Sequence, residues 1–187
     1  MILKTIRFLT KKSKFYNSLK IKEKVFLKKF FVYFCEKFFN ICEMNQIIPI
    51  ASDHGGFVMK QYLIERLKDS GYEVKDYGCY SAESVDYPDM IHPLAQDIQD
   101  EKYPLGIILC GSGNGAQMTA NHHPHVRAAL CWNVEIAKLA RQHNDANILA
   151  LPGRFISNEM AWDIVKAYLT TDFEGGRHLN RIKKIDL

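Results

Sequence analysis

From residue 44 onward, short apolar runs alternate with segments of helical periodicity, and this alternation constrains the fold more than any other feature. The first run, Gln46 to Ser52, ends at a glycine-containing turn, after which Met59, Leu63 and Leu67 recur at helical spacing. Further strands are predicted at Tyr72–Tyr77, Leu105–Leu109, Val126–Trp132 and Asn147–Leu151. Further helices are predicted over Pro88–Ile98, after Gly115, over Val134–Arg141 and through Met160, Ile164, Ala167 and Tyr168.

Strands that alternate with helices form right-handed crossovers, which place parallel strands in one sheet with helices on both faces. We therefore predict a three-layer, Rossmann-like α/β domain with a five-stranded parallel sheet. Some of the runs lack polar alternation, as expected for strands that are buried on both faces. Pro49 conflicts with a central position for the first strand, because proline cannot donate a backbone hydrogen bond.

Residues 1–43 differ from the rest of the chain in composition. They contain 11 Lys and Arg, three Glu and eight of the 11 phenylalanines, but no Gly, Pro or Ala. A/T-rich non-coding DNA would specify this composition, so we expect an extension over 1–43 that precedes the true start, and a functional domain over 44–187. The alternative is a basic amphipathic helix on an anionic membrane surface, because Phe and Lys alternate in helical blocks from Lys20 to Phe39.

Charge and cysteine usage exclude several classes of protein. The chain carries a formal charge of +4, but residues 44–187 hold 14 Lys and Arg against 18 Asp and Glu. An acidic domain is unsuited to general nucleic-acid binding. The five cysteines are widely spaced without a C-x-x-C pair, which favours reduced thiols in the cytoplasm over a disulfide framework or a zinc knuckle. The most apolar stretch, Phe30 to Cys42, contains charges, so no membrane span is predicted.

Polar and reactive side chains follow several predicted strands, and ligands of parallel α/β sheets bind at the carboxyl ends of strands. The candidates are Asp53 and His54 after the first strand, Cys110 and Gly111-Ser112-Gly113-Asn114-Gly115 at the third, and Arg154 after the fifth. Reactive groups at several strand ends indicate an active site.

The turn Gly111–Gly115 lets the backbone approach an anion, and its N–H groups at a helix start point toward negative charge. A phosphate or a reaction oxyanion would suit it, although the turn has neither a Walker lysine nor the dinucleotide motif. Cys110 stands beside these dipoles, which favour a thiolate nucleophile or base. The alternative is a buried structural cysteine, as we expect for Cys79 and Cys131. His143 is either a general acid or base, or the cap of its helix.

Each of the two remaining basic clusters has a structural interpretation beside a functional one. His122, His123 and His125 lack a carboxylate at ligand spacing, so we expect a solvated turn and no metal site. Arg177 and Arg181 stand four residues apart and would share one face of a helix. Such a pair can bind a phosphate, or it forms a solvent-facing basic turn.

Together these motifs resemble those of ribose-5-phosphate isomerases of type B, in the sugar-phosphate isomerase family that also includes galactose-6-phosphate isomerase subunits. The resemblance runs from Gln46 to about Ile185. The motifs are Ser52-Asp53-His54-Gly55-Gly56, Asp86-Tyr87-Pro88, Cys110 to Gly115, Arg141-Gln142-His143-Asn144-Asp145-Ala146-Asn147 and Glu174-Gly175-Gly176-Arg177-His178. Several spaced motifs in one order are more specific than any single glycine turn.

The resemblance implies interconversion of ribose 5-phosphate and ribulose 5-phosphate by proton transfer between C2 and C1 through an enediolate, with no metal or organic cofactor. Cys110 matches the general base of the family, and His143 matches the acid that opens the furanose ring. The backbone N–H groups of Gly111, Ser112, Gly113, Asn114 and Gly115 would hold the developing oxyanion.

The resemblance also implies the substrate-binding residues and the assembly. Asp53, His54 and Asn144 match positions that bind sugar hydroxyls or assist ring opening, and Tyr87 lines the pocket. The residues that match the family's phosphate- and substrate-binding positions are Arg154, Arg177 and Arg181. Because family sites lie between two subunits, a homodimer is implied, and pairing of dimers into tetramers stays open.

Two other functions stay open from the sequence. One is the same chemistry on a six-carbon sugar phosphate, such as galactose 6-phosphate or allose 6-phosphate, since the sequence does not reveal pocket length. The other is a non-catalytic module that binds a sugar phosphate through the glycine turn. The presence of both Cys110 and His143 disfavours the binding module.

Overall fold

The computed structural model describes residues 46–185, which lie in the compact unit Asn45–Leu187. The predicted extension over 1–43 lies outside the described residues. The strands are β1 (Ile47–Ser52), β2 (Glu73–Asp76), β3 (Gly106–Cys110), β4 (Ala128–Leu130) and β5 (Ile148–Pro152). The helices of this part of the chain are α4 (Phe57–Asp69), α5 (Tyr87–Gln99), α6 (Asn114–Ala120), α7 (Val134–Asn144), α8 (Asn158–Thr170) and α9 (Arg177–Ile182).

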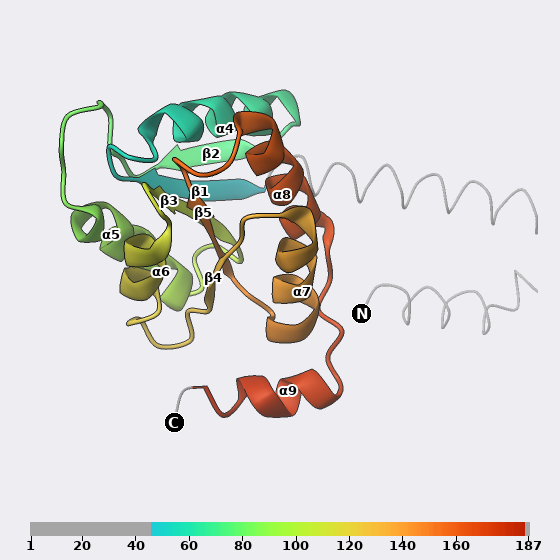
Figure 1. Ribbon diagram of the computed structural model, residues 1–187. Coiled ribbons are helices and arrows are strands. Elements are labelled where there is room, and N and C mark those ends of the chain that lie inside the picture. Colours follow the sequence, from blue (N-terminus) through green and yellow to red (C-terminus); the bar gives the residue numbers. More distant parts are fainter. Residues whose placement is uncertain (1–45, 186–187) are drawn as a thin grey trace, which may run out of the picture. The chain divides into compact units, whose positions relative to one another are not determined.

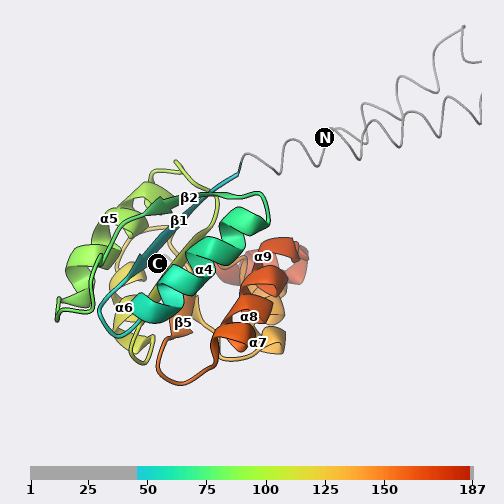
Figure 2. The same cartoon turned by 90° about the horizontal axis from the view of Figure 1, so that it is seen from above.

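The five strands form one sheet in the order β2-β1-β3-β5-β4, and every neighbouring pair is parallel. Helices α4, α7 and α8 cover one face of the sheet, and α5 and α6 cover the other (Figures 1 and 2). The predicted three-layer α/β domain with a five-stranded parallel sheet is therefore confirmed.

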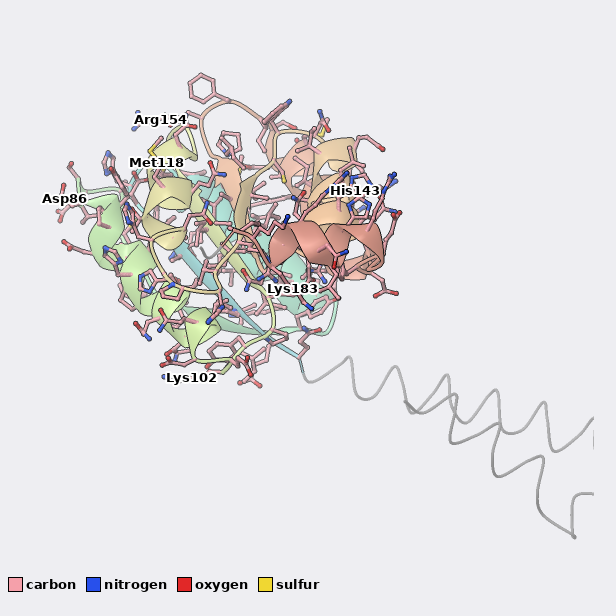
Figure 3. The ribbon with its side chains drawn as sticks, turned by 90° about the horizontal axis from the view of Figure 1, so that it is seen from below. Asp86, Lys102, Met118, His143, Arg154 and Lys183 are labelled. Atoms are coloured by element: carbon pink, nitrogen blue, oxygen red, sulfur yellow. The ribbon has the colours of Figure 1, made fainter. Side chains whose placement is uncertain are left out.

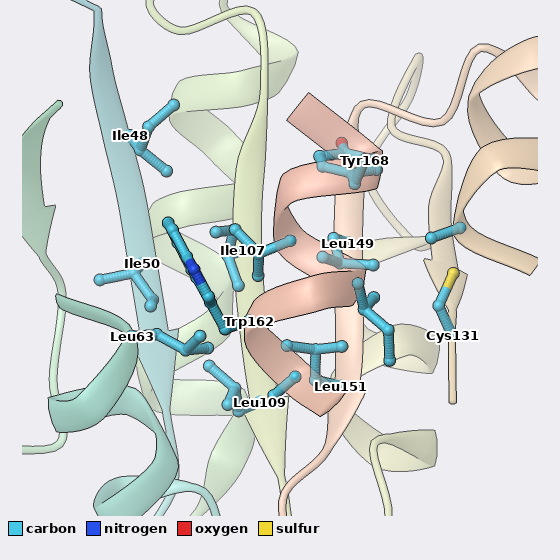
Figure 4. Close-up of a cluster of buried hydrophobic side chains, with 14 of the residues drawn as sticks. Ile48, Ile50, Leu63, Ile107, Leu109, Cys131, Leu149, Leu151, Trp162 and Tyr168 are labelled. Atoms are coloured by element: carbon cyan, nitrogen blue, oxygen red, sulfur yellow. The ribbon is translucent and has the colours of Figure 1, made fainter. Parts of the chain in front are cut away.

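Alternate residues of each buried strand supply the two cores. On the α4, α7 and α8 face, Trp162 and Tyr168 pack against Ile107, Leu109 and Leu149 (Figure 4). Ile108 and Cys110 point to the opposite face, where they join the core under α5 and α6. This two-sided burial explains why the strand sequences lack polar alternation.

Pro49 is accommodated in the central strand β1 because of where the ladders begin. The Ile50 carbonyl accepts a hydrogen bond from Tyr77 on the β2 side, so the neighbouring Pro49 nitrogen faces β3. The pairing between β1 and β3 starts only at Ile50 opposite Ile107. The missing N–H group of Pro49 thus removes no ladder hydrogen bond.

Strand β4 is shorter than the predicted run Val126–Trp132, and asparagine side chains bind the backbone at its start, Asn147 on the β5 side and Asn121 on the outer edge. The Asn147 Oδ1 atom accepts from the Arg127 amide at 2.7 Å, and the Asn121 Oδ1 atom accepts from the Ala128 amide at 2.7 Å. None of the helices between residues 46 and 185 combines the length and the hydropathy that a membrane span requires.

Candidate active site

The carboxyl ends of β1 and β3 lie at the point where the chain connections diverge. β1 leads into α4 on one face of the sheet, whereas β3 leads into α6 on the other face (Figure 2). Such a divergence opens a crevice beyond the strand ends, which is where open parallel sheets bind ligands. Asp53 follows β1 and Cys110 ends β3, so both predicted residues stand at this crevice.

Three loops meet closely at the crevice because each contributes a glycine. A Cβ atom at Gly55 would lie 2.8 Å from the Gly111 nitrogen, and one at Gly153 would lie 2.9 Å from the Gly55 carbonyl oxygen. Backbone hydrogen bonds join the same loops, from Gly153 to the Cys110 carbonyl at 2.9 Å and from Arg154 to the Gly111 carbonyl at 3.0 Å. Any side chain at these positions would push the loops apart.

Cys110 is held by the turn that follows it. The Gly113 amide donates a hydrogen bond to Cys110 Sγ at 3.1 Å, and Gly113 has a φ of 80°, which favours glycine. An N–H group that points at sulfur stabilises negative charge there. The Cys110 side chain is buried, as is the whole of β3, so this thiol lies at the inner wall of the crevice.

Asp53 and His54 are fixed by backbone amides of two loops. The buried Asp53 carboxylate accepts from the Gly56 amide at 3.0 Å. His54 Nδ1 accepts from the Val85 amide at 3.3 Å, which assigns the imidazole proton to Nε2. His54 therefore keeps an N–H donor available for a ligand and links the loop before α5 to the crevice.

Tyr87 and Arg154 flank the glycine turn. The Tyr87 ring lies against Gly115, where a Cβ atom would stand 2.7 Å from the ring carbon Cζ. The exposed Arg154 side chain passes 3.5 Å from the Cβ position of Gly111. The structure thus gathers Asp53, His54, Tyr87, Cys110, the turn Gly111-Ser112-Gly113-Asn114-Gly115 and Arg154 at one edge of the sheet, which we call the carboxyl-edge cluster.

A second group of the predicted residues lies around the end of α7 and the start of α9, and we call it the α7–α9 cluster. The His143 and His178 rings stack with centroids 4.3 Å apart and an interplanar angle of 5°. Glu174 lies 3.9 Å from His143 and 3.7 Å from His178, measured from its Oε2 to each Nε2. The Glu174 amide donates to the Gln142 carbonyl at 3.0 Å, which ties this loop to α7.

His178 lies between basic side chains and the Glu174 carboxylate, which raises the pKa of His178 by less than the other causes lower it. Burial of the ring lowers the pKa of His178, and His143, Arg177 and Arg181 lower this pKa further by charge repulsion. The Arg177 Nε atom donates to His178 Nε2 at 3.4 Å. Arg177 and Arg181 are exposed on one turn of α9, so both guanidinium groups remain accessible to an anion.

The two clusters stand at opposite edges of the sheet. The Gly106 amide at the start of β3 donates to the Asn147 carbonyl, which places Asn147 at the amino edge. His143 and Asn144 end α7 just before Asn147, whereas Cys110 lies at the far end of β3, about 13 Å along the strand from Gly106. Figure 3 shows Arg154 and His143 on different sides of the domain. A single chain therefore does not bring Cys110 and His143 together.

The described cysteines are free thiols as expected, whereas His123 has a partner that the sequence does not indicate. Cys79, Cys110 and Cys131 are free thiols, and Cys131 is buried in the core, which raises its pKa to about 12. His123 does not stand alone in a turn, because its Nε2 lies 2.8 Å from His92 Nδ1 on α5. Sequence spacing does not connect the two histidines, since 31 positions separate them.

Two charged residues have positions that the sequence pattern does not predict. Lys60 lies on the buried face of α4 and pairs with Asp76, a placement that an amphipathic pattern does not indicate for lysine. Glu174 stands in a recognised motif, but only the fold places its carboxylate between His143 and His178. The i,i+4 spacing of Glu174 and His178 was the only available signal.

A cysteine, an aspartate and a glycine turn at the divergence point of a parallel sheet define an α/β enzyme for small anionic substrates. Comparison with known proteins agrees with this class. The model of the Ribose/Galactose Isomerase family matches residues 48–185. The ribose-5-phosphate isomerase B of Escherichia coli is 38% identical over 138 residues, which cover 74% of this chain and 93% of that protein.

Solved structures give the same result. A ribose 5-phosphate isomerase from Thermotoga maritima has a TM-score of 0.74 and 50% identity, covering 75% of this chain and 97% of that one. A Mycoplasma genitalium ribose-5-phosphate isomerase B with bound ribulose-5-phosphate has a TM-score of 0.71 and 40% identity, covering 75% and 93% of the two chains. The present chain belongs to the ribose/galactose isomerase family and is an aldose–ketose isomerase.

Proposed function

We propose that this enzyme interconverts ribose 5-phosphate and ribulose 5-phosphate, and that two chains form each active site. The observation that carries the proposal is the Cys110 sulfur at the divergence point of the sheet, where it accepts a hydrogen bond from the Gly113 amide. The proposal is supported by the E. coli and M. pneumoniae relatives, which are named as a ribose-5-phosphate isomerase B and a probable one. It is further supported by the similar M. genitalium structure with bound ribulose-5-phosphate.

Ring opening comes first, because the proton at C2 becomes acidic only beside a free aldehyde. His143 donates a proton to the ring oxygen while the Asp53 carboxylate takes the proton of the anomeric hydroxyl, so that the C1–O4 bond breaks and the C1 carbonyl forms. Asp53, His54 and Asn144 bind the sugar hydroxyls and hold the open chain. Arg154, Arg177 and Arg181 bind the phosphate, and Tyr87 closes the pocket wall.

Proton transfer follows at the carboxyl-edge cluster. The Cys110 thiolate takes the C2 proton, the C–H electrons form the C1–C2 double bond, and the carbonyl electrons move to O1. The amides of Gly111 to Gly115 stabilise this enediolate, since they carry positive dipole ends without any need to reorganise. The Cys110 thiol returns the proton to C1, and the hydroxyl proton passes from O2 to O1, which gives the neutral ketose.

A homodimer would supply what one chain lacks. Cys110 and His143 stand at opposite edges of one sheet, so an acid and a base from the same chain cannot act on one five-carbon substrate. A second copy related by two-fold symmetry would place its α7–α9 cluster against the carboxyl-edge cluster of the first, and the reverse. We infer a homodimer with two equivalent sites on this ground.

Proton NMR of ribose 5-phosphate in D2O tests the activity directly. With the purified full chain, we expect loss of the C2 proton signal together with the appearance of ribulose 5-phosphate. Each turnover passes through an enediolate, so deuterium from solvent enters at C1 or C2. Glucose 6-phosphate isomerisation by any contaminating host enzyme is measured in parallel as a purity control.

Three outcomes separate the candidate functions. Exchange with ketose formation supports the pentose activity. Turnover of galactose 6-phosphate or allose 6-phosphate with an inert ribose 5-phosphate would contradict it in favour of a six-carbon substrate. Ligand binding without proton exchange on any of these substrates would leave only the non-catalytic binding module.

A further inference from the structure

Three potential metal ligands converge in the α7–α9 cluster, from segments that are distant in sequence. His143 ends α7, Glu174 lies in the loop after α8, and His178 lies in the first turn of α9. One donor atom from each residue can be chosen so that all three lie within 4.8 Å of one another. Figure 3 shows the His143 side chain next to α9. Among the described residues, this is the group of three that could hold a metal ion.

The donor set suits zinc. Two imidazole nitrogens and one carboxylate oxygen form a known three-ligand zinc set, which leaves a fourth position for water or another ligand. Bonds of about 2.1 Å in a tetrahedral arrangement put neighbouring donors about 3.4 Å apart. The two measured separations from Glu174 Oε2 are 3.9 Å to His143 Nε2 and 3.7 Å to His178 Nε2. These two separations are therefore a few tenths of an ångström too long, whereas the donor atoms of the two imidazoles, which lie within 4.8 Å of each other, must approach by a larger movement of one ring.

Metal binding requires movement of His143 and Glu174, and both side chains are partly exposed to solvent. His178 is 5% exposed and its amide is bonded to the Gly175 carbonyl, so this ring is the fixed ligand. The side chains of His143 and Glu174 are 37% and 50% exposed, and each can rotate toward a shared ion. The stacked imidazole rings must also turn well out of parallel, since the lone pair of each ring lies in its own plane and two parallel planes share no position for one ion. The half-exposed His143 ring therefore has to leave the stack.

Two arginines oppose the binding of a cation at this place. Arg177 donates to His178 Nε2, and Arg181 lies one turn further along α9. Both guanidinium groups are exposed, so Arg177 can turn toward solvent and water and salt screen much of the repulsion. Glu174 supplies the compensating negative charge directly among the ligands.

We propose that His143, Glu174 and His178 form a binding site for a divalent transition metal ion of the zinc type, and that occupation of this site inhibits the enzyme. A bound ion would occupy the Nε2 lone pair of His143 and would add a positive charge beside Arg177. The inhibitory part rests on the proposed function, because it requires His143 to be the ring-opening acid. The binding part does not depend on the reaction.

The test measures zinc binding by competition with a chromogenic chelator, using the full chain. We expect about one tight equivalent of Zn²⁺ per chain, and Glu174→Gln or His178→Gln should weaken it by at least about tenfold. The matched control is His92→Gln, because His92 and His123 form another close imidazole pair but lack a carboxylate ligand. His92→Gln should leave the tight equivalent unchanged. Co²⁺ bound in place of zinc should show the visible absorption of a four-coordinate ion, and Glu174→Gln should abolish it.

Equal zinc affinity in the parent chain, Glu174→Gln and His178→Gln would overturn the site, as would loss of the tight equivalent in His92→Gln alone. Inhibition is measured separately, as the rate of ribose 5-phosphate isomerisation with one equivalent of Zn²⁺ and after its removal by a chelator. Reversible loss of most of the rate is expected. Full activity with zinc demonstrably bound would overturn the inhibitory part. No turnover of ribose 5-phosphate by the zinc-free protein would contradict the proposed function, and the metal site would then be judged by the binding titration alone.

Discussion

Two buried cysteines on the sheet differ in what their sulfur atoms contact. Cys110 Sγ accepts a hydrogen bond from the Gly113 amide at 3.1 Å. The Cys131 thiol instead points to the Ala129 carbonyl at 3.6 Å, and burial raises its pKa to about 12. The Cys110 sulfur is therefore an acceptor at the loop that follows β3, whereas the Cys131 thiol is a buried donor in the core. We therefore expect only Cys110 to take part in proton transfer.

Replacement of the proposed base tests this difference. Cys110→Ala should lower kcat for ribose 5-phosphate by about a thousandfold with little change in KM, because a general base acts in the transition state and contributes little to ground-state binding. Cys131→Ala is the matched control and should retain kcat. Steady-state kinetics measure both variants. A Cys110→Ala enzyme with the parent kcat would remove Cys110 from the mechanism.

Gly113 combines a left-handed backbone with a crowded position. Its φ is 80°, and a Cβ atom would lie 2.3 Å from Leu130 Cδ1 and 3.2 Å from the Leu151 carbonyl carbon and oxygen. Gly113→Ala should therefore lower the free energy of unfolding by about 3 kcal/mol, from backbone strain and overpacking together. Gly175 has a φ of 67° with no atom within 4 Å of its Cβ position, so Gly175→Ala isolates the strain, at about 1 kcal/mol. Urea titration should show this order, and equal losses would contradict the packing argument.

At the scale of the elements, a buried ion pair joins α4 to the end of β2. Lys60 is fully buried, and its Nζ atom donates to Asp76 Oδ1 at 2.5 Å and to the Cys79 carbonyl at 2.7 Å. Asp76 Oδ1 also accepts from the Gly78 amide at 2.9 Å. These contacts fix the start of the loop that contains Val85, whose amide donates to His54. The pair thus supports the crevice without touching it.

Loss of this lysine should be costly. Lys60→Met keeps the side-chain volume but leaves Asp76 without its cation, so the free energy of unfolding should fall by about 3 kcal/mol. Lys102 pairs with Asp97 at 2.6 Å, but its side chain is 55% exposed, and Lys102→Met should leave the unfolding midpoint almost unchanged. Thermal unfolding of the two variants makes the comparison. A Lys60→Met protein as stable as Lys102→Met would show that the ion pair contributes no net stability.

The helices are predictable from sequence because they have a clear period, and the buried strands because they are short continuous apolar runs that end in turns with recognisable residues. The exceptions have physical causes. Strand β4 begins later than predicted because the Asn147 side chain binds the Arg127 amide, and a sequence pattern does not reveal such a partner. The position of Lys60 depends on Asp76, a tertiary contact. The separation of Cys110 from His143 follows from the sheet register, which periodicity alone does not give.

At the scale of the whole molecule, residues 44–187 should suffice for the proposed activity. The family model matches only residues 48–185, and both clusters lie within residues 46–185. We therefore expect a chain that begins at Met44 to have the same unfolding midpoint and the same kcat as the full chain. Circular dichroism and the isomerase assay measure this. A large loss of either in the shorter chain would assign residues 1–43 a role in folding or assembly.

The proposed active site between two subunits makes a quantitative prediction for mixed assemblies. Cys110→Ala and His143→Gln chains should each be inactive alone, because every site lacks its base or its acid. Random mixing makes half of the dimers mixed, and each mixed dimer has one site with both residues intact, so activity should return to about a quarter of the parent value.

The control mixes two chains that are altered in the same cluster. Cys110→Ala with Asp53→Asn should recover no activity, since both residues belong to the carboxyl-edge cluster of one chain and every mixed site keeps one defect. The two chains are co-expressed with different tags, and the mixed dimer is isolated by successive affinity steps. The isolated mixed dimer of Cys110→Ala and His143→Gln has one intact site of two, so its activity should be about half of the parent value. If each chain formed its own site, the Cys110→Ala and His143→Gln mixture would stay inactive as well, because no chain in it carries both groups. Recovery in the first mixture alone is therefore specific to a site that combines Cys110 of one subunit with His143 of the other.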